Sequence, residues 1–242
     1  MLTLRYICAF GFNQAKILGK MYRSMFTCLL LAGCLVAAQA QNNSLGKNDP
    51  DAKKVLDALS VKLKSYKAVE ANFTLKVEDS KGTLQGSKAG IVYIKGSKYH
   101  ISITGQEVYS DGKDIWTYDK SSNEVTITKS DPAASTISPE KFFSDFYDKD
   151  FLYKLNGESK LGGVAVDEVE LTPIDKTKSF YKVLLYIDKE KHTMVSIKWY
   201  DKSGNRYTLN TSKLNGNAPI TDMQLAFSKA KYPGVELVDL RN

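Results

Sequence analysis

Apolar and polar residues alternate strictly over residues 69–77, and no other feature restricts the fold of this 242-residue chain as strongly. Because the side chains of a strand point alternately to its two faces, a period of two predicts a strand with one apolar and one wet face. Shorter segments of the same kind follow, separated by turn residues. They lie at residues 87–95, 99–104, 107–110, 114–118, 124–128, 164–171, 181–187, 194–200, 206–214 and 224–227. Many short strands without alternating helices predict a mainly β protein with an antiparallel sheet.

One amphipathic helix is expected before the first strand, over residues 51–65. Asp49 suits the N-cap of this helix and Pro50 its first position. Apolar residues recur on one face at helical spacing, namely Val55, Leu56, Leu59 and Leu63.

Residues 131–155 interrupt the series of strands. Ser138 and Pro139 are typical of the start of a short helix. Aromatic residues then crowd a region that is expected to be a surface connection, namely Phe142, Phe143, Phe146, Tyr147, Phe151 and Tyr153. A long connection inside a compact β domain is often a lid or a binding loop. The same residues could instead plug one end of the sheet as ordinary core, and their spacing does not separate the two interpretations.

The first 40 residues are typical of a secretory signal peptide and are not expected to join the fold. A basic segment at residues 20–23 precedes an apolar run, and an A-x-A cleavage site ends at Ala40. The apolar run is too short for a spanning helix. We expect a polar leader at residues 41–50 and a single domain at 51–242, since no Gly-rich or Pro-rich linker divides the remainder.

Two details of this N-terminal region stay open. Signal peptides begin close to their basic residues, so Met21 or Met25 is the expected start and residues 1–20 are an upstream extension. Residues 31–34 also read as a lipobox, in which Cys34 would carry lipid and anchor the protein to a membrane. The apolar residues that follow this cysteine favour signal cleavage instead.

The sequence after the signal peptide offers little for catalysis. All three cysteines lie within the first 40 residues, which excludes a thiol nucleophile, a disulfide and a thiolate metal site from the fold. The two histidines are His100, on the polar side of its strand, and His192, in a turn. Nucleophile-elbow, zinc-helix and phosphate-loop motifs do not occur. We therefore predict no catalytic, cofactor-binding or metal-binding residue, and no enzyme.

The charge balance argues against nucleic-acid binding. The formal net charge is +7, but four basic residues and no acidic residue lie in the first 40. The remainder holds 30 basic and 27 acidic residues, a balance of +3. A nucleic-acid surface would need a far stronger basic excess.

The apolar positions of the predicted strands form one long face, and only two short helices are expected to cover about ten strands. Such a thin cover predicts an apolar cavity or groove between the sheet and the helices.

Residues 108–119 read VYSDGKDIWTYD and are followed by a Val–Thr pair at 125–126. This motif resembles the LolA family of periplasmic carriers of outer-membrane lipoproteins. Two weaker motifs agree in order. Residues 69–77 are similar to the family's first strand, A-x-F-x-x-x-V, and residues 227–241 are similar to its closing segment. The resemblance covers residues 51–241.

The resemblance implies an incomplete antiparallel β-barrel of about 10–11 strands, with a helical lid over an apolar cavity. It implies a carrier that takes lipoprotein acyl chains from the inner to the outer membrane without a cofactor or a chemical step. The implied partners are an inner-membrane lipoprotein-releasing transporter and an outer-membrane acceptor, and we expect a monomer. The lid would carry Leu56, Leu59 and Leu63. The candidate cavity residues are Phe73, Leu75, Val77, Tyr93, Ile101, Ile103, Ile115, Trp116, Phe142, Phe143, Phe146, Val183 and Leu185.

One position departs from the family pattern. Many members carry an arginine just after the strand equivalent to residues 91–95, and this arginine latches the lid over the empty cavity. Here Gly96 lies near the matching place, so Lys95 or Lys98 would have to substitute. A lysine lacks the planar fork of donors that an arginine offers. The alternative function is therefore a LolA-like lipid-binding sensor or a membrane-tethered lipoprotein of the cell envelope.

Overall fold

The computed structural model describes residues 47–130 and 146–241, all of which belong to a compact unit at Ser44–Asn242. The expected signal peptide, most of the polar leader and the expected short helix after Ser138 lie outside the described residues. Within the described ranges, no helix combines the length and the apolar character needed to cross a membrane.

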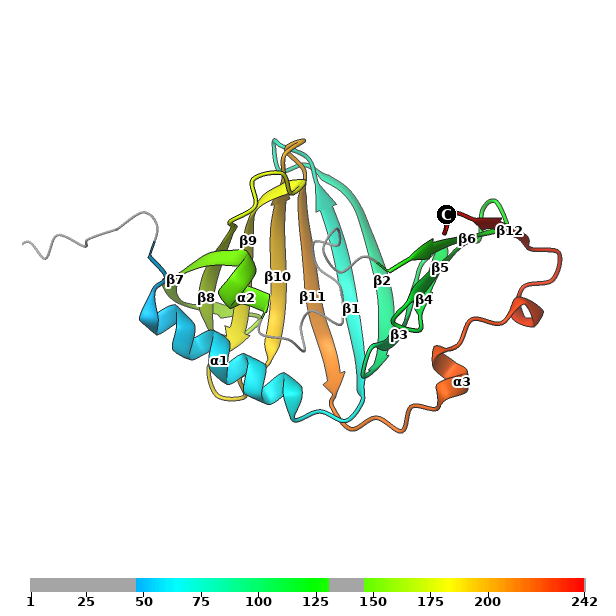
Figure 1. The fold of residues 1–242 in the computed structure, drawn as a ribbon. Coiled ribbons are helices and arrows are strands. Elements are labelled where there is room, and N and C mark those ends of the chain that lie inside the picture. The colour runs from blue at the N-terminus through cyan, green and yellow to red at the C-terminus, as the bar shows by residue number, and fades with distance from the viewer. Residues whose placement is uncertain (1–46, 131–145, 242) are drawn as a thin grey trace, which may run out of the picture. The chain divides into compact units, whose positions relative to one another are not determined.

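Twelve strands form one sheet (Figure 1). In chain order they are β1 (Val69–Glu78), β2 (Leu84–Lys95), β3 (Lys98–Ile103), β4 (Gln106–Ser110), β5 (Asp114–Asp119), β6 (Glu124–Lys129), β7 (Phe151–Leu161), β8 (Val164–Pro173), β9 (Phe180–Asp188), β10 (Met194–Asp201), β11 (Arg206–Asn215) and β12 (Glu236–Asp239). Their order across the sheet is β12-β6-β5-β4-β3-β2-β1-β11-β10-β9-β8-β7.

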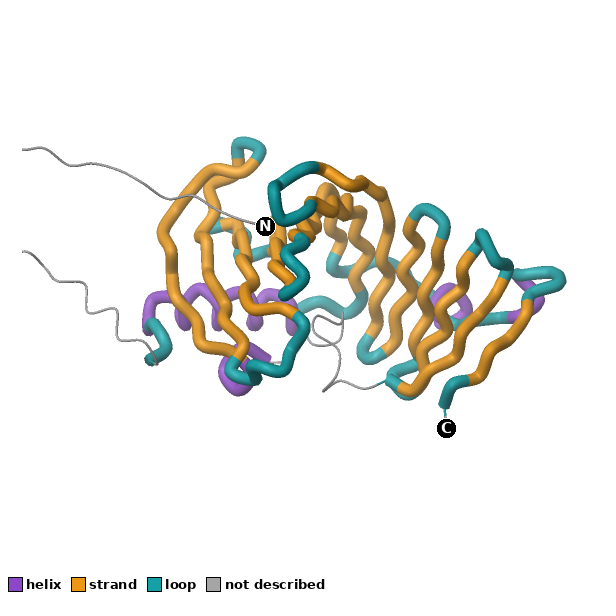
Figure 2. Tube along the Cα trace, turned by 90° about the horizontal axis from the view of Figure 1, so that it is seen from above, coloured by secondary structure: helices purple, strands orange, loops and turns teal. Residues whose placement is uncertain are grey.

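Neighbouring strands are antiparallel, except that β12 runs parallel to β6. The sheet stays unclosed, because β7 and β12 end the order without pairing with each other (Figure 2). The prediction of a mainly β fold with an unclosed antiparallel sheet is confirmed.

Helices are few and short. They are α1 (Pro50–Lys64), α2 (Phe146–Asp150), α3 (Asp222–Leu225) and a 3-10 turn, η2 (Lys229–Lys231). The expected helix at 51–65 therefore forms with its bounds shifted by one residue. The expected strand at 224–227 is wrong, because α3 occupies its first two residues. The cause is local: the backbone N–H of Thr221 donates to Oε1 of Gln224 at 2.8 Å, which closes the first turn of a helix.

Two strands were not expected. β7 begins in the region read as a long connection and continues beyond it. Leu152 interrupts the alternation of Phe151, Tyr153 and Leu155 there. β12 has only four residues and pairs with a strand more than 100 positions earlier, Glu236 opposite Glu124. The sheet consequently has one strand more than the upper end of the expected range.

The start of α1 is tied to the edge strand β7. The Asp49 side chain caps the helix by accepting from the N–H of Asp51 at 2.9 Å, and its second oxygen accepts from the N–H of Leu155 at 3.0 Å. The backbone N–H of Asp49 also donates to the carbonyl of Tyr153 at 3.1 Å, and Asn48 Oδ1 accepts from the N–H of Tyr153 at 3.2 Å. These bonds fix the N-terminal end of α1 against the outer side of β7.

The main core lies between α1 and strands β7 to β10. Leu56, Leu59 and Leu63 of α1 are buried there, and we call the side of the sheet that they contact the α1 face. The sheet residues in this core include Tyr153, Val169, Leu171, Val183, Leu185 and Ile197.

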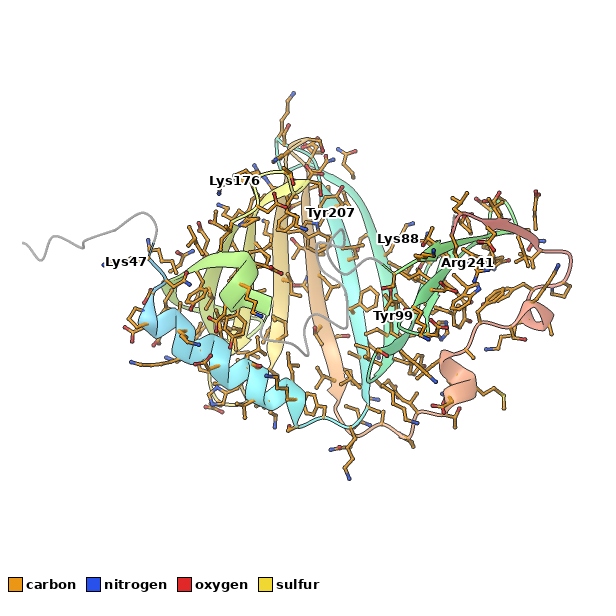
Figure 3. The ribbon with its side chains drawn as sticks, viewed as in Figure 1. Lys47, Lys88, Tyr99, Lys176, Tyr207 and Arg241 are labelled. Atoms are coloured by element: carbon orange, nitrogen blue, oxygen red, sulfur yellow. The ribbon has the colours of Figure 1, made fainter. Side chains whose placement is uncertain are left out.

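Residues 222–241, which we call the C-terminal segment, cover the opposite face of the sheet. α3 lies against β2 and β3, while Tyr232 and Val235 are buried with Tyr109, Val125 and Ile127. Beyond β12, Arg241 Nη1 donates to Asp114 Oδ2 at 2.6 Å (Figure 3). The last described residues are thus held on β5 and β6.

Candidate functional site

The register of the sheet decides which side chains share a face, because residues directly opposite each other in an antiparallel pair point to the same side. Val183, in the core below α1, is opposite Trp199, which is opposite Tyr207, which is opposite Val77. Figure 3 labels Tyr207 on β11. Leu185 leads by the same steps to Leu75.

The α1 face continues across the other half of the sheet. Phe73 is opposite Gly90, and Gly90 is opposite Ile103. Ile101 is two residues from Ile103 on β3 and so points to the same face. The pairing of β3 with β4 and of β4 with β5 places Ile115 on this face as well. Eight candidate cavity residues therefore share one face: Phe73, Leu75, Val77, Ile101, Ile103, Ile115, Val183 and Leu185.

Burial is uneven along this face. Val183 and Leu185, next to α1, are about fully buried at 2% and 1% exposure. Phe73 is also buried, at 8% exposure. The other candidates on β1, β3 and β5 are only half-buried, namely Leu75, Val77, Ile101, Ile103 and Ile115. The apolar face thus extends well beyond the strands that α1 covers.

Two pockets of about 420 Å³ each mark this face. One is lined by Phe180, Trp199 and Tyr207 together with four polar residues at 179 and 201–203. The rings of Trp199 and Tyr207 stack at 5.1 Å between centroids. The other lies where α1 leads into β1 and is lined by Tyr66 and Val69, among others. Aromatic and aliphatic walls of this kind suit an apolar ligand.

Tyr93 and Trp116 do not join the other candidates. Tyr93 is opposite His100, and Trp116 stacks on Phe227 of the C-terminal segment at 6.1 Å, so both point to the opposite face. In both cases the adjacent residue along the strand is apolar too, as Ile115 is beside Trp116. The alternation of apolar and polar residues therefore cannot show which of the two side chains lies on the α1 face.

The aromatic segment contributes little to the described site. Phe142 and Phe143 lie outside the described residues, and Phe146 is the first residue of α2. Tyr147, which follows, is buried in the main core.

The three lid candidates, Leu56, Leu59 and Leu63, are buried against the sheet with 1%, 5% and 8% exposure. They place an apolar helix face over β7 to β10. A role of this helix as a lid stays a prediction.

Sequence reasoning missed several side chains of the α1 face. On β2 and β4, Val92 and Val108 are each opposite Ile101. On β11, Tyr207 and Leu209 continue the face. Val92 stands in a run of four apolar residues, so no alternation shows its face. Only the pairing register of the strands places it on the α1 face.

A polar network lies on the opposite face, under the C-terminal segment. Glu107 Oε2 accepts from the hydroxyls of Tyr109 at 2.7 Å and Tyr232 at 2.9 Å. His100 Nε2 lies 2.9 Å from the same oxygen, and its ring stacks on that of Tyr109 at 4.1 Å. Burial raises the pKa of Tyr232 to about 12 and lowers that of His100, so both are neutral near pH 7. The network accordingly fastens the C-terminal segment to β3 and β4.

The latch position also has a described partner. Lys95 Nζ lies 3.1 Å from Asp222 Oδ1 of α3, and both side chains are largely exposed. Lys98 is exposed as well. Lys95 therefore ties β2 to the C-terminal segment.

Comparison with known proteins agrees with this architecture. Residues 64–228 match the family "Outer membrane lipoprotein carrier protein LolA". An outer-membrane lipoprotein carrier protein of Cupriavidus necator is 27% identical over 183 residues, which are 72% of this chain and 84% of that protein.

Solved structures also align with this chain. An uncharacterized conserved protein from Thermus thermophilus aligns with a TM-score of 0.53 and 14% identity, over 78% of this chain and 99% of that one. A LolA superfamily protein from Nitrosomonas europaea aligns with a TM-score of 0.40 and 15% identity, over 73% and 97%. The family match spans well over half of the residues of this chain, and the chain therefore belongs to the LolA family.

Proposed function

We propose that this protein is a periplasmic carrier that binds the acyl chains of lipoproteins on the α1 face and moves them from the inner to the outer membrane. The observation that carries the proposal is the apolar face that continues past α1, with half-buried Leu75, Val77, Ile101, Ile103 and Ile115. The family match and the carrier from Cupriavidus necator support it.

Physical chemistry explains why such a carrier is needed. Each methylene moved out of water contributes about 0.8 kcal/mol, so one chain of about 16 carbons represents roughly 12 kcal/mol. A lipoprotein with several chains does not leave its membrane for water unaided. A carrier must offset this cost and still release its cargo, which a lid in equilibrium between two positions would allow. We assign that lid to α1, through Leu56, Leu59 and Leu63.

The remaining parts of the proposal follow from the sequence. The signal peptide at residues 1–40 would export the protein, and it would work as a monomer without a chemical step. Loading requires an inner-membrane lipoprotein-releasing transporter, and unloading requires an outer-membrane acceptor.

The test is uptake of a fluorescent acyl-chain probe by the delipidated protein. Leu75→Glu and Ile101→Glu place a charge on the half-buried α1 face, and we expect each to abolish uptake. Thr74→Glu is the matched control, since Thr74 neighbours Leu75 on the same strand but points to the opposite face. Circular dichroism establishes that all three variants are folded. Full uptake by both folded α1-face variants would refute the proposal.

The lipobox-like residues 31–34 favour one second candidate, a lipid-binding protein tethered through Cys34. Intact mass spectrometry of protein from an expressing bacterium distinguishes the two. A mature N-terminus at Gln41 supports the soluble carrier, whereas a diacylated Cys34 supports the tethered form.

A further inference from the structure

The C-terminal end of α1, the β2–β3 turn and α3 lie along the same end of the sheet (Figure 1). Exposed lysines or exposed apolar residues stand on each of these segments. We call this surface the basic end. It consists of Val61, Lys64, Lys67, Lys95, Lys98 and Met223.

A pocket joins the parts of the basic end. Its volume is about 420 Å³, and Lys64 and Lys67 line it on the α1 side. Gly96 and Ser97 of the β2–β3 turn line it on the other side, and Lys95 and Lys98 directly flank that pair. Two of the four lysines thus line the pocket, and the other two stand beside its turn and point to the opposite face of the sheet.

One wall of this pocket is apolar. Tyr66, Val69 and Ile94 line it, and Val69 is opposite Ile94 on the α1 face. The Lys62 ammonium lies 5.6 Å from the centroid of the Tyr66 ring, a cation–π contact at the rim. The pocket thus lies on the face on which acyl chains are proposed to bind.

Charge at this surface is strongly one-sided. Asp222 is paired with Lys95 at 3.1 Å, and the hydrogen bond from Lys95, with the nearby charge of Lys98, lowers the pKa of Asp222. Lys67, Lys95, Lys98 and this carboxylate together carry a net charge of +2.

Apolar side chains protrude beside the lysines. Met223 and Val61 are the two most exposed large hydrophobic residues of the described chain, at 78% and 70%. Val61 lies one helical turn before Lys64, and Met223 follows Asp222, the partner of Lys95. Protruding apolar residues among lysines are typical of surfaces that lie in the interface of an anionic membrane.

We infer that the basic end docks on the anionic surface of a phospholipid bilayer, with Val61 and Met223 entering the headgroup region. This inference rests on the proposed function and deepens it, because docking would place the opening of the pocket at the lipid surface. The lysines supply charge complementarity to lipid phosphates, and the apolar wall of the pocket suits an acyl chain rather than a free phosphate ion.

The test is co-sedimentation of the full protein with vesicles. One set is pure phosphatidylcholine, and the other contains phosphatidylcholine and phosphatidylglycerol at about 7:3. We expect preference for the anionic set, and loss of that preference as the ionic strength rises to about 1 M and the Debye length falls to about 3 Å. Lys67→Gln/Lys98→Gln should weaken binding about fivefold for each lysine.

The control is Lys129→Gln/Lys160→Gln, which removes the same charge from β6 and β7. We expect it to bind like the unaltered protein. Val61→Ser/Met223→Ser should weaken binding to the anionic set while keeping its salt dependence. Unfolding midpoints establish that all variants are folded.

Equal binding to both vesicle sets, or equal loss in the control pair, would overturn the inference. Binding to neither set would also overturn it and would leave an acidic protein as the partner of this surface. Uptake of the acyl probe from solution by the unaltered protein is measured separately. Its absence refutes the carrier proposal, whereas its presence without vesicle preference refutes only the docking inference.

Discussion

Replacing Gly216 by alanine should destabilise the protein through a single side chain, Tyr66. A Cβ at this glycine would lie 1.9, 2.2 and 2.5 Å from Cδ1, Cε1 and Cγ of the Tyr66 ring. Ordinary contact needs about 3.5 Å, so the ring would have to move by roughly 1.5 Å. Tyr66 packs against two clusters of buried residues, one below α1 and one around Val69 and Ile94, so a movement of its ring into the adjoining pocket would break contacts with both.

The magnitude follows from the geometry. Overpacking of this kind costs about 1–3 kcal/mol, and 1 kcal/mol corresponds to a shift in Tm of roughly 2–4 °C for a domain of this size. Gly216 does not adopt a positive φ, so alanine itself fits its backbone. Gly216→Ala in a Tyr66→Ala background should therefore be neutral or stabilise by up to about 1 kcal/mol, because alanine restricts the unfolded chain.

Urea unfolding of the four proteins of this double-mutant cycle provides the measurement. The expected coupling energy between the two positions is about 2 kcal/mol. Gly86→Ala is the matched control, since nothing lies within 4 Å of a Cβ there. If Gly216→Ala costs the same in both backgrounds, within about 0.5 kcal/mol, the clash with Tyr66 is not the cause and the reasoning fails.

Two further predictions concern the hydrogen bonds that hold the start of α1 and the C-terminal segment. Asp49→Ala should destabilise the protein by about 1–2 kcal/mol at pH 7, because it removes the helix cap and the acceptor for the Leu155 N–H. Burial opposes ionisation, yet the backbone hydrogen bonds lower the pKa of Asp49, so its contribution is present above the unfolded pKa and declines as the pH falls below about 4. Urea titrations at pH 7 and pH 3 check this, and an equal loss at both would contradict it. Tyr232→Phe removes hydrogen bonds to Glu107 and Tyr109 and should cost about 1–3 kcal/mol, with faster amide exchange around Tyr232; unchanged exchange would show that the network does not hold the segment.

The elements that the sequence predicted correctly are those whose pattern is local and unambiguous. β1 differs from its predicted span by one residue, because its alternation is uninterrupted. α1 was predicted from its cap, Asp49, and from a regular apolar stripe. Each of these signals comes from residues within one element.

The parts that could not be predicted depend on distant pairing. β12 is recognisable only from its partner, β6, since four residues carry no usable period. Tyr93 and Trp116 were grouped with the other candidates although they point to the opposite face. Consecutive residues of their strands are apolar, so only the register shows which face each side chain takes. The candidate site was therefore predictable as a face, but its full membership was not.

An unclosed sheet keeps two strand edges that a closed barrel would not have, and exposed edges invite pairing with another copy of the chain. This protein protects both edges. Asn48 and Asp49 occupy the backbone groups of the first half of β7, and Glu158 and Lys160 place charges on its second half. β12 is short, and Glu236 and Asp239 mark its ends. The sheet can thus remain open on its apolar face while its edges disfavour aggregation.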